Sequence, residues 1–234
     1  MLTRARRWLR WKLGPRGFSE LHLVHSVLTA PGVMVDAGAH HGGSLYPFAK
    51  EGWWVYAFEP DTRNRTVLKQ AAAGLRRVVI DPRAIGERDG EELPLFTSEV
   101  STGISTLRAF HSSHRSTTTA ITVRFDTALA DVDEVTLLKT DLEGWDLIAL
   151  RTFPWDRLRP RVVVCEFEDR KTVPLGYTFH DLARFLVAGG YLVLVSEWYP
   201  VVEYGQQHRW RSLRPYPVEL ADPDGWGNLI GEAD

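Results

Sequence analysis

The stretch Val33–Gly43 reads VMVDAGAHHGG, and it decides how the rest of the chain is interpreted. A short apolar run ends at Asp36 and is followed by small residues and three glycines, a composition typical of a buried strand that leads into a tight turn. Glycine tolerates backbone conformations and close approaches that a side chain would block. The stretch therefore predicts a strand followed by a turn that a ligand approaches closely.

Apolar runs of the same kind recur along the chain and alternate with helix-like runs. The expected strands cover 33–38, 54–60, 76–81, 135–141, 161–168 and 191–197, and the expected helices cover 44–51, 61–74, 144–153 and 179–188. The strand runs are nearly continuous in Val, Ile, Leu and aromatic residues, which is typical of strands covered on both faces. This alternation predicts an α/β fold with a parallel sheet and right-handed crossovers.

The length of 234 residues suits one large domain, and the composition is that of a globular protein. We expect a basic helical segment at 1–29, followed by one domain at 30–234 with insertions near 90–128 and 198–226. Insertions this long on a compact sheet are often functional loops or lids.

Charge and cysteine content limit the partners and the compartment. A net charge of -2 gives a nucleic-acid partner no overall electrostatic support. The chain has one cysteine and no apolar run of about 18 residues, so we expect a cytoplasmic protein. The basic residues of 1–17 alternate with Trp and Leu, which favours a helix packed on the domain over one that docks on a membrane surface. The sequence does not indicate an oligomeric state.

In open α/β sheets, ligands bind at the carboxyl ends of the strands. The first strand delivers Asp36, Gly38, Ala39, His40 and Gly42 to this edge. The pattern is not the dinucleotide fingerprint G-x-G-x-x-G, because Asp36 stands where the first glycine is required, and its carboxylate would repel a pyrophosphate. It suits a ligand with a cationic group and no phosphate at this point, and S-adenosylmethionine is such a ligand.

The next two strands end in further candidate residues for this cofactor. Glu59, followed by Pro60, ends the second strand, where a carboxylate can accept both ribose hydroxyls. Asp81 ends the third strand and is placed to meet the adenine amino group, with Ala84 and Ile85 against the ring. The structural alternatives are a helix N-terminal acid at Glu59 and a simple turn at Asp81.

The fourth and fifth strands end in acids. Asp141 and Glu143 follow the fourth strand, where Asp141 also contacts the predicted cofactor, and Glu166 lies at the end of the fifth. Neighbouring strands are about 5 Å apart, so Asp141 and Glu166 are within side-chain reach. Close carboxylates favour a raised pKa or a divalent cation, which makes Asp141 and Glu166 candidate ligands of Mg²⁺. For Asp146 we expect only a favourable interaction with a helix dipole.

At these residues the sequence resembles the FkbM family of S-adenosylmethionine-dependent methyltransferases. The resemblance rests on DAGAHHG at 36–42, AFEP at 57–60, the turn at 84–86 and KTDLEGWD at 139–146, and it continues through VVVCE and the GGY of 189–191. It implies the class I methyltransferase fold, a seven-stranded, mostly parallel sheet with helices on both faces and an antiparallel C-terminal hairpin. It also implies O-methylation of a hydroxyl on a sugar, glycan or glycosylated natural product.

Such a reaction requires a group that removes the hydroxyl proton. The candidate bases are Asp141, Glu143 and Glu166 at the strand ends, and His111 and His114 in the first insertion. A histidine, or a metal ion that lowers the pKa of the hydroxyl, would serve better than an unassisted carboxylate. Loop histidines are otherwise usually solvated surface residues, so both interpretations of His111 and His114 stay open.

The second insertion is rich in aromatic and basic side chains: Tyr199, Tyr204, His208, Trp210, Arg211, Arg214 and Tyr216. Aromatic faces stack on pyranose rings and arginine holds acidic groups, so we expect this segment to cover the acceptor. The alternative is a structural cap packed on the sheet. Two rival functions remain, a nucleotide-cofactor (NAD-type) binding domain and a non-catalytic binding module. Calorimetry with S-adenosylmethionine and NAD separates them.

Overall fold

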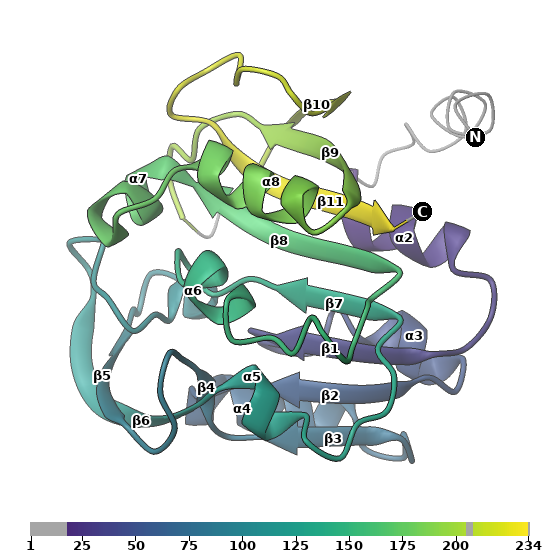
Figure 1. The fold of residues 1–234 in the computed structure, drawn as a ribbon. Helices are drawn as coiled ribbons and strands as arrows, with labels where there is room; N and C mark the ends of the chain where they lie inside the picture. The colour runs from purple at the N-terminus through teal and green to yellow at the C-terminus, as the bar shows by residue number, and fades with distance from the viewer. Residues whose placement is uncertain (1–17, 205–207, 234) are drawn as a thin grey trace.

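The computed structural model describes residues 18–204 and 208–233, so residues 1–17 of the predicted basic segment at 1–29 lie outside the described residues. Within them, eight strands form one sheet in the order β10-β9-β11-β8-β7-β1-β2-β3 (Figure 1). The parallel part consists of β3 (Val78–Asp81), β2 (Trp54–Phe58), β1 (Val33–Ala37), β7 (Leu137–Thr140) and β8 (Val162–Glu168). The antiparallel part consists of β11 (Trp226–Ala233), β9 (Tyr191–Trp198) and β10 (Trp210–Pro215).

This architecture confirms the predicted fold class. The six expected strands form, and three of them, β1, β7 and β8, are buried at every residue. The strands nearer the edges are covered less completely, since Val79 of β3 and Leu192 of β9 are exposed. The sheet has one strand more than predicted, because Trp210–Pro215 pairs with β9 at its outer edge. An edge strand accepts a terminal proline, since its outer side needs no backbone donor.

Helices cover both faces of the sheet because successive residues of a buried strand point to opposite sides. One apolar cluster packs against α5 (Phe125–Ala128), α6 (Asp146–Leu150) and α8 (Phe179–Ala188), and α6 and α8 lie in front of the sheet in Figure 1. The other cluster packs against α2 (Glu20–Val27), α3 (Tyr46–Lys50) and α4 (Thr62–Ala71). A short helix α7 (Asp169–Thr172) and a 3₁₀ turn η2 (Val173–Leu175) follow β8.

The first insertion forms a second, three-stranded sheet together with the short strand that precedes it. β4 (Ala84–Ile85), β6 (Arg115–Val123) and β5 (Glu92–Thr97) pair in that order, and the turn η1 (Thr102–Ile104) lies between β5 and β6. Figure 1 shows β5 and β6 beside the ends toward which β1, β2 and β7 point. The insertion therefore stands at the carboxyl edge of the main sheet, where ligands bind in such folds.

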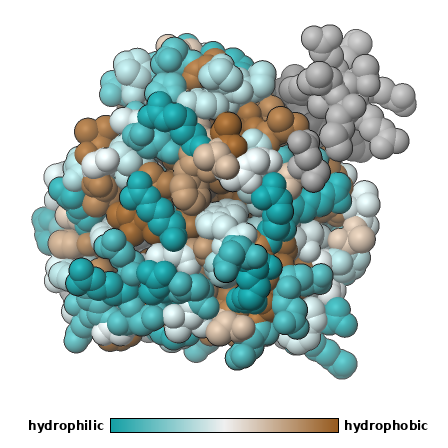
Figure 2. Space-filling view, in the orientation of Figure 1, coloured by the Kyte–Doolittle hydropathy of each residue, from teal (hydrophilic) through white to brown (hydrophobic). Residues whose placement is uncertain are grey.

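The second insertion contacts both α2 and the first insertion, where the ring of Tyr204 lies 5.2 Å from that of His111. The buried Glu20 of α2 accepts hydrogen bonds from Ser196 Oγ at 2.6 Å and from Trp198 Nε1 at 2.7 Å. Phe18 stacks on Trp210 with ring centroids 4.3 Å apart. In the part of the chain that the structure describes, no helix is long and apolar enough to span a membrane. Hydrophilic and hydrophobic residues are interspersed on the face shown in Figure 2.

Candidate active site

A cavity of about 150 Å³ lies at the carboxyl ends of β1, β2 and β7. Its walls come from the turn after β1, the end of β2, the segment after β7 and the first insertion. The lining residues are Gly38, His40, Phe58, Glu59, Pro60, Asn64, Arg83, Ala84, Ile85, Leu95, Thr102, Gly103, Ser105, Thr106, Leu107, Asp141, Leu142 and Glu143. The cavity thus brings most of the predicted cofactor residues together with two of the candidate bases.

The turn after β1 requires glycine. Gly38 has a φ of 81°, and a Cβ at this position would lie 2.0 Å from the carbonyl oxygen of Asp141. The amides of Gly38 and Ala39 both donate to the carbonyl oxygen of Phe58, at 3.0 and 3.1 Å. Gly42 also has a positive φ, 86°, and closes the turn by donating to Ala39. This geometry keeps the turn close to the strand ends, as the sequence predicted.

Asp36 lies behind this turn and does not line the cavity. Its carboxylate is fully buried, accepts a hydrogen bond from Ser44 Oγ and forms an ion pair with Lys139 Nζ at 3.0 Å. Lys139 Nζ also donates to the carbonyl oxygen of Gly38 at 2.8 Å. Burial alone would lower the pKa of Lys139, but the charges of Asp36 and Asp141 raise it above its usual value. Asp36 is therefore linked to the turn after β1 through Lys139, whereas the sequence predicts that it contacts the ligand directly.

Glu59 faces the cavity and is almost fully buried. Its two oxygens accept the backbone amides of His40 and Asp61, both at 2.8 Å. Burial raises its pKa to about 7, although the two amides act in the opposite direction. Each carboxylate oxygen keeps a second acceptor site. The residues therefore fit the ribose of the predicted cofactor.

Of the three residues predicted to contact the adenine, two line the cavity. Ala84 and Ile85 line the cavity, as expected of residues against a ring. Asp81 instead binds Arg83, with Oδ2 2.6 Å from Nη2 and Oδ1 accepting the Arg83 amide, and it does not line the cavity. Asn64 was not predicted. It is buried in the cavity wall with no sequence motif to mark it.

The first insertion closes one side of the cavity. His40 Nε2 lies 2.9 Å from Thr102 Oγ1, and Asn64 Nδ2 donates to the carbonyl oxygen of Thr102 at 3.0 Å. Ser105 Oγ donates to Asp61 at 2.9 Å. These contacts join η1 to the cofactor turn and to α4, so the insertion forms a wall of the site.

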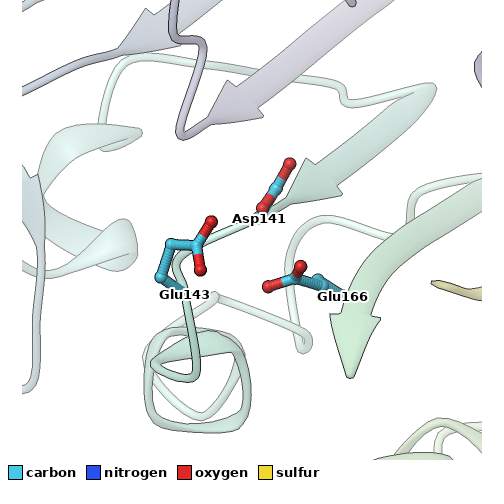
Figure 3. A group of neighbouring side chains, drawn as sticks. All are labelled: Asp141, Glu143 and Glu166. Carbon is cyan, nitrogen blue, oxygen red and sulfur yellow. The ribbon is translucent and has the colours of Figure 1, made fainter. Parts of the chain in front are cut away.

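Three candidate bases meet beside the cavity. Carboxylate oxygens of Asp141, Glu143 and Glu166 lie within 4.8 Å of one another, and Figure 3 shows the three side chains turned toward a common space. Asp141 and Glu143 line the cavity, and Glu166 lies behind them. Burial raises the pKa of Glu143 to about 7, against the opposing effect of Lys171. Burial also raises the pKa of Glu166 well above its usual value.

Lys171 of α7 was not predicted, and its ammonium forms ion pairs with two of these acids and with Glu168. Its Nζ lies 2.6 Å from Glu143, 3.2 Å from Glu166 and 2.8 Å from Glu168. A Mg²⁺ ion would need the same oxygens at about 2.1 Å. The residues therefore do not fit the Mg²⁺ site that we expected from Asp141 and Glu166.

Asp146, from the same KTDLEGWD motif, stabilises the backbone turn after β7. It is fully buried, and it accepts hydrogen bonds from Thr140 Oγ1 at 2.6 Å and from the Leu142 amide at 3.3 Å. It does not line the cavity. Asp146 thus holds the turn that carries Asp141 and Glu143.

The two histidines of the insertion do not line the cavity. Nδ1 of the buried His114 accepts the amides of Phe110 and His111, at 3.2 and 3.4 Å, and its Nε2 lies 2.9 Å from the carbonyl oxygen of Ile104. Burial lowers its pKa. His111 Nδ1 lies 2.7 Å from Ser113 Oγ. Both imidazole nitrogens of His114 therefore serve the loop's own backbone, which does not favour a role as base.

The aromatic segment after β9 also lies outside the cavity wall. Trp210 Nε1 donates to Ser196 Oγ at 3.1 Å, and Arg214 forms an ion pair with the buried Glu197. Tyr204 comes nearer to the acids, since its hydroxyl oxygen accepts from Arg170 at 2.7 Å. This placement favours a structural cap over the predicted acceptor cover.

A sequence model described as the methyltransferase FkbM domain matches residues 36–193. No curated protein matches the chain. The solved structures that resemble it include an rRNA methylase from Streptococcus thermophilus (14% identity, 93% of this chain and 98% of that one, TM-score 0.47). They also include a putative O-methyltransferase from Klebsiella pneumoniae (12% identity, 92% of this chain and 78% of that one, TM-score 0.48). A third is a TehB-like SAM-dependent methyltransferase from Corynebacterium glutamicum (13% identity, 100% of this chain and 97% of that one, TM-score 0.46).

Proposed function

The chain belongs to the FkbM family of S-adenosylmethionine-dependent methyltransferases, and we propose that it methylates a hydroxyl of a sugar, glycan or glycosylated natural product. The observation that carries this proposal is the position of Glu143. Its carboxylate lines the same cavity as the cofactor turn and Glu59, and it is almost fully buried.

The bound cofactor would supply a methyl group already activated by its sulfonium charge. Glu59 would hold the ribose hydroxyls, and the turn at Gly38 would let the cofactor approach the backbone. Glu143 would accept the proton of the acceptor hydroxyl while the new oxygen–carbon bond forms and the sulfur–carbon bond breaks. Alignment at attack distance supplies about 7–11 kcal/mol in the best cases, and a base adds about 10²–10⁴-fold.

Among the candidate bases, Glu143 satisfies the requirements best. A general base is most effective with a pKa near the working pH, and burial brings that of Glu143 to about 7. Asp141 is 42% exposed and lies 3.6 Å from Lys139. Glu166 does not line the cavity.

The insertion supports a hydroxyl-rich acceptor. It lines the cavity with the hydroxyl side chains of Thr102, Ser105 and Thr106. Hydroxyls both donate and accept hydrogen bonds, so they can match the alternating donors and acceptors of a sugar.

The proposal is tested by a screen with isotope-labelled methyl donor against glycosylated acceptors and their deoxy and O-methyl analogues. We expect transfer to one hydroxyl and none to the analogue that lacks it. In Glu143→Gln, kcat should fall about 10²–10⁴-fold with cofactor affinity retained, because only the base is lost. The exposed Glu134→Gln is the matched control. Wild-type turnover in Glu143→Gln, or methylation of nitrogen alone, would contradict the proposal.

A further inference from the structure

Lys171 is the most enclosed cation among the described residues of the site. Its ammonium forms ion pairs with Glu143, Glu166 and Glu168 at 2.6, 3.2 and 2.8 Å, and the side chain is 3% exposed. The ring of Phe110, from the first insertion, lies 5.1 Å from Nζ. The side chain is thus enclosed from several elements.

The carboxylates around this ammonium are enough to accept all of its hydrogen bonds. An ammonium has three donors, and three carboxylates stand in contact with it. The Lys171 backbone packs closely against Gly144, since a Cβ at Gly144 would lie 3.0 Å from the Lys171 Cβ. Gly144 follows Glu143 in the chain, so the lysine packs directly against the turn that carries the proposed base.

The carboxylates around Lys171 outnumber the cations that contact them. Glu168 is shared, since its other oxygen lies 2.7 Å from Arg170. Three carboxylates therefore face two cations, and Glu143 is the member that lines the cavity. A net negative charge in a buried site favours uptake of a proton.

From these contacts we infer that Lys171 is the built-in cation of the site, which takes the place of a divalent metal ion and positions Glu143 for proton removal. The inference deepens the proposed function and rests on it. An ammonium and a metal ion cannot share the carboxylate oxygens, since Mg²⁺ requires them at about 2.1 Å in an octahedral set. Methyl transfer should then proceed without a divalent metal.

Metal binding is measured first, because it requires no acceptor. Mn²⁺ is titrated by electron paramagnetic resonance into the full chain and into Glu166→Gln. We expect the two curves to coincide, with no site in the cluster tighter than about 1 mM. A bound Mn²⁺ that disappears in Glu166→Gln would overturn the inference even if the acceptor screen failed. Its absence would support the inference independently of the acceptor.

Turnover is measured next, in wild type with EDTA and in Lys171→Ala with and without propylammonium. EDTA should not change the wild-type rate. Lys171→Ala should lose about 100-fold in kcat with cofactor affinity retained, and propylammonium, but not propanol, should raise its rate about tenfold by restoring the charge. The exposed Lys69→Ala controls for loss of a positive charge.

A wild-type kcat in Lys171→Ala would overturn the positioning role. Equal effects of propylammonium and propanol would overturn it too, since they would show that only the lost volume matters. If Lys171→Ala does not fold, the Mn²⁺ titration and the EDTA experiment on wild type still decide whether a metal serves the site.

Discussion

Two buried lysines, Lys139 at the end of β7 and Lys171 in α7, differ in how many buried acids each one meets. Lys139 forms its short ion pair with one buried acid, Asp36, at 3.0 Å, and also binds the carbonyl oxygen of Gly38. Lys171 meets Glu143, Glu166 and Glu168. Burial would lower the pKa of each lysine, and in each the acids raise it above its usual value. The matched pair of Asp36 and Lys139 supports the turn after β1. The cluster around Lys171 has more carboxylates than cations and therefore keeps a negative charge that can take a proton.

Breaking the matched pair should have the largest effect. In Asp36→Asn, the buried Lys139 loses its close carboxylate, so we expect a loss of about 3–5 kcal/mol in the free energy of unfolding. Cofactor binding should be lost as well, because Lys139 holds the turn at Gly38. Urea unfolding and calorimetry with S-adenosylmethionine measure the two effects.

The double variant Asp36→Asn/Lys139→Met serves as the control for that experiment. Replacing both charges removes the uncompensated cation and should recover part of the stability. If Asp36→Asn alone changes neither stability nor cofactor affinity, Lys139 does not depend on Asp36, and the contrast between the two lysines fails.

A smaller effect on stability is expected from Glu59, whose carboxylate is held by two backbone amides and not by a lysine. Burial raises its pKa from 4.5 to about 7, so the folded state favours the protonated form. Its contribution to stability is fully present below about pH 4.5 and is lost as the pH rises to about 7, by up to about 3 kcal/mol. The Glu59→Gln variant cannot titrate, so its unfolding free energy should lack this decline.

Unfolding of both proteins across this pH range measures the difference. If the free energies of unfolding of wild type and Glu59→Gln change with pH in the same way, the pKa of Glu59 is not raised by burial in the folded protein. In the same range, cofactor affinity of the wild type should rise with pH, since the ionised carboxylate is the better acceptor for ribose hydroxyls.

The smallest effect on catalysis is expected at Trp210. Its ring stacks on Phe18 and its indole nitrogen donates to Ser196, outside both lysine networks. Trp210→Ala should lower stability by about 3 kcal/mol through loss of packing and leave the acceptor KM unchanged. A strong rise in acceptor KM, with the fold intact, would assign the aromatic segment to the acceptor.

Much of the fold could be predicted because local signals agreed with it. The helix Phe179–Ala188 matched its predicted bounds, since Thr178 and Asp181 form a capping box and Gly189 ends it. The predicted helix at 61–74 ended earlier, at Ala71, and Gly74 lies in the following turn. The edge strand β10 could not be predicted, because its pairing with β9 depends on tertiary contacts and not on an apolar pattern.

The site was predictable where a motif carries the geometry. Gly38 and Glu59 line the cavity because a strand end and a tight turn fix their positions. Lys171 stands in the sequence EDRK, which is typical of a solvated helix start. Its burial arises from carboxylates on two other segments and from the covering insertion. No local pattern reports such contacts, so a metal ion was expected where the chain provides its own cation.

The sheet order has a consequence for how the protein forms during synthesis. β11 lies between β8 and β9 and pairs with both, although it is the last of the described strands to be made. Until residues 226–233 leave the ribosome, β8 and β9 each present an open hydrogen-bonding edge that can attract other chains. A nascent chain interrupted before Trp226 should therefore depend on chaperones, and a stop codon there should give an aggregating product although the residues of the cavity are all present.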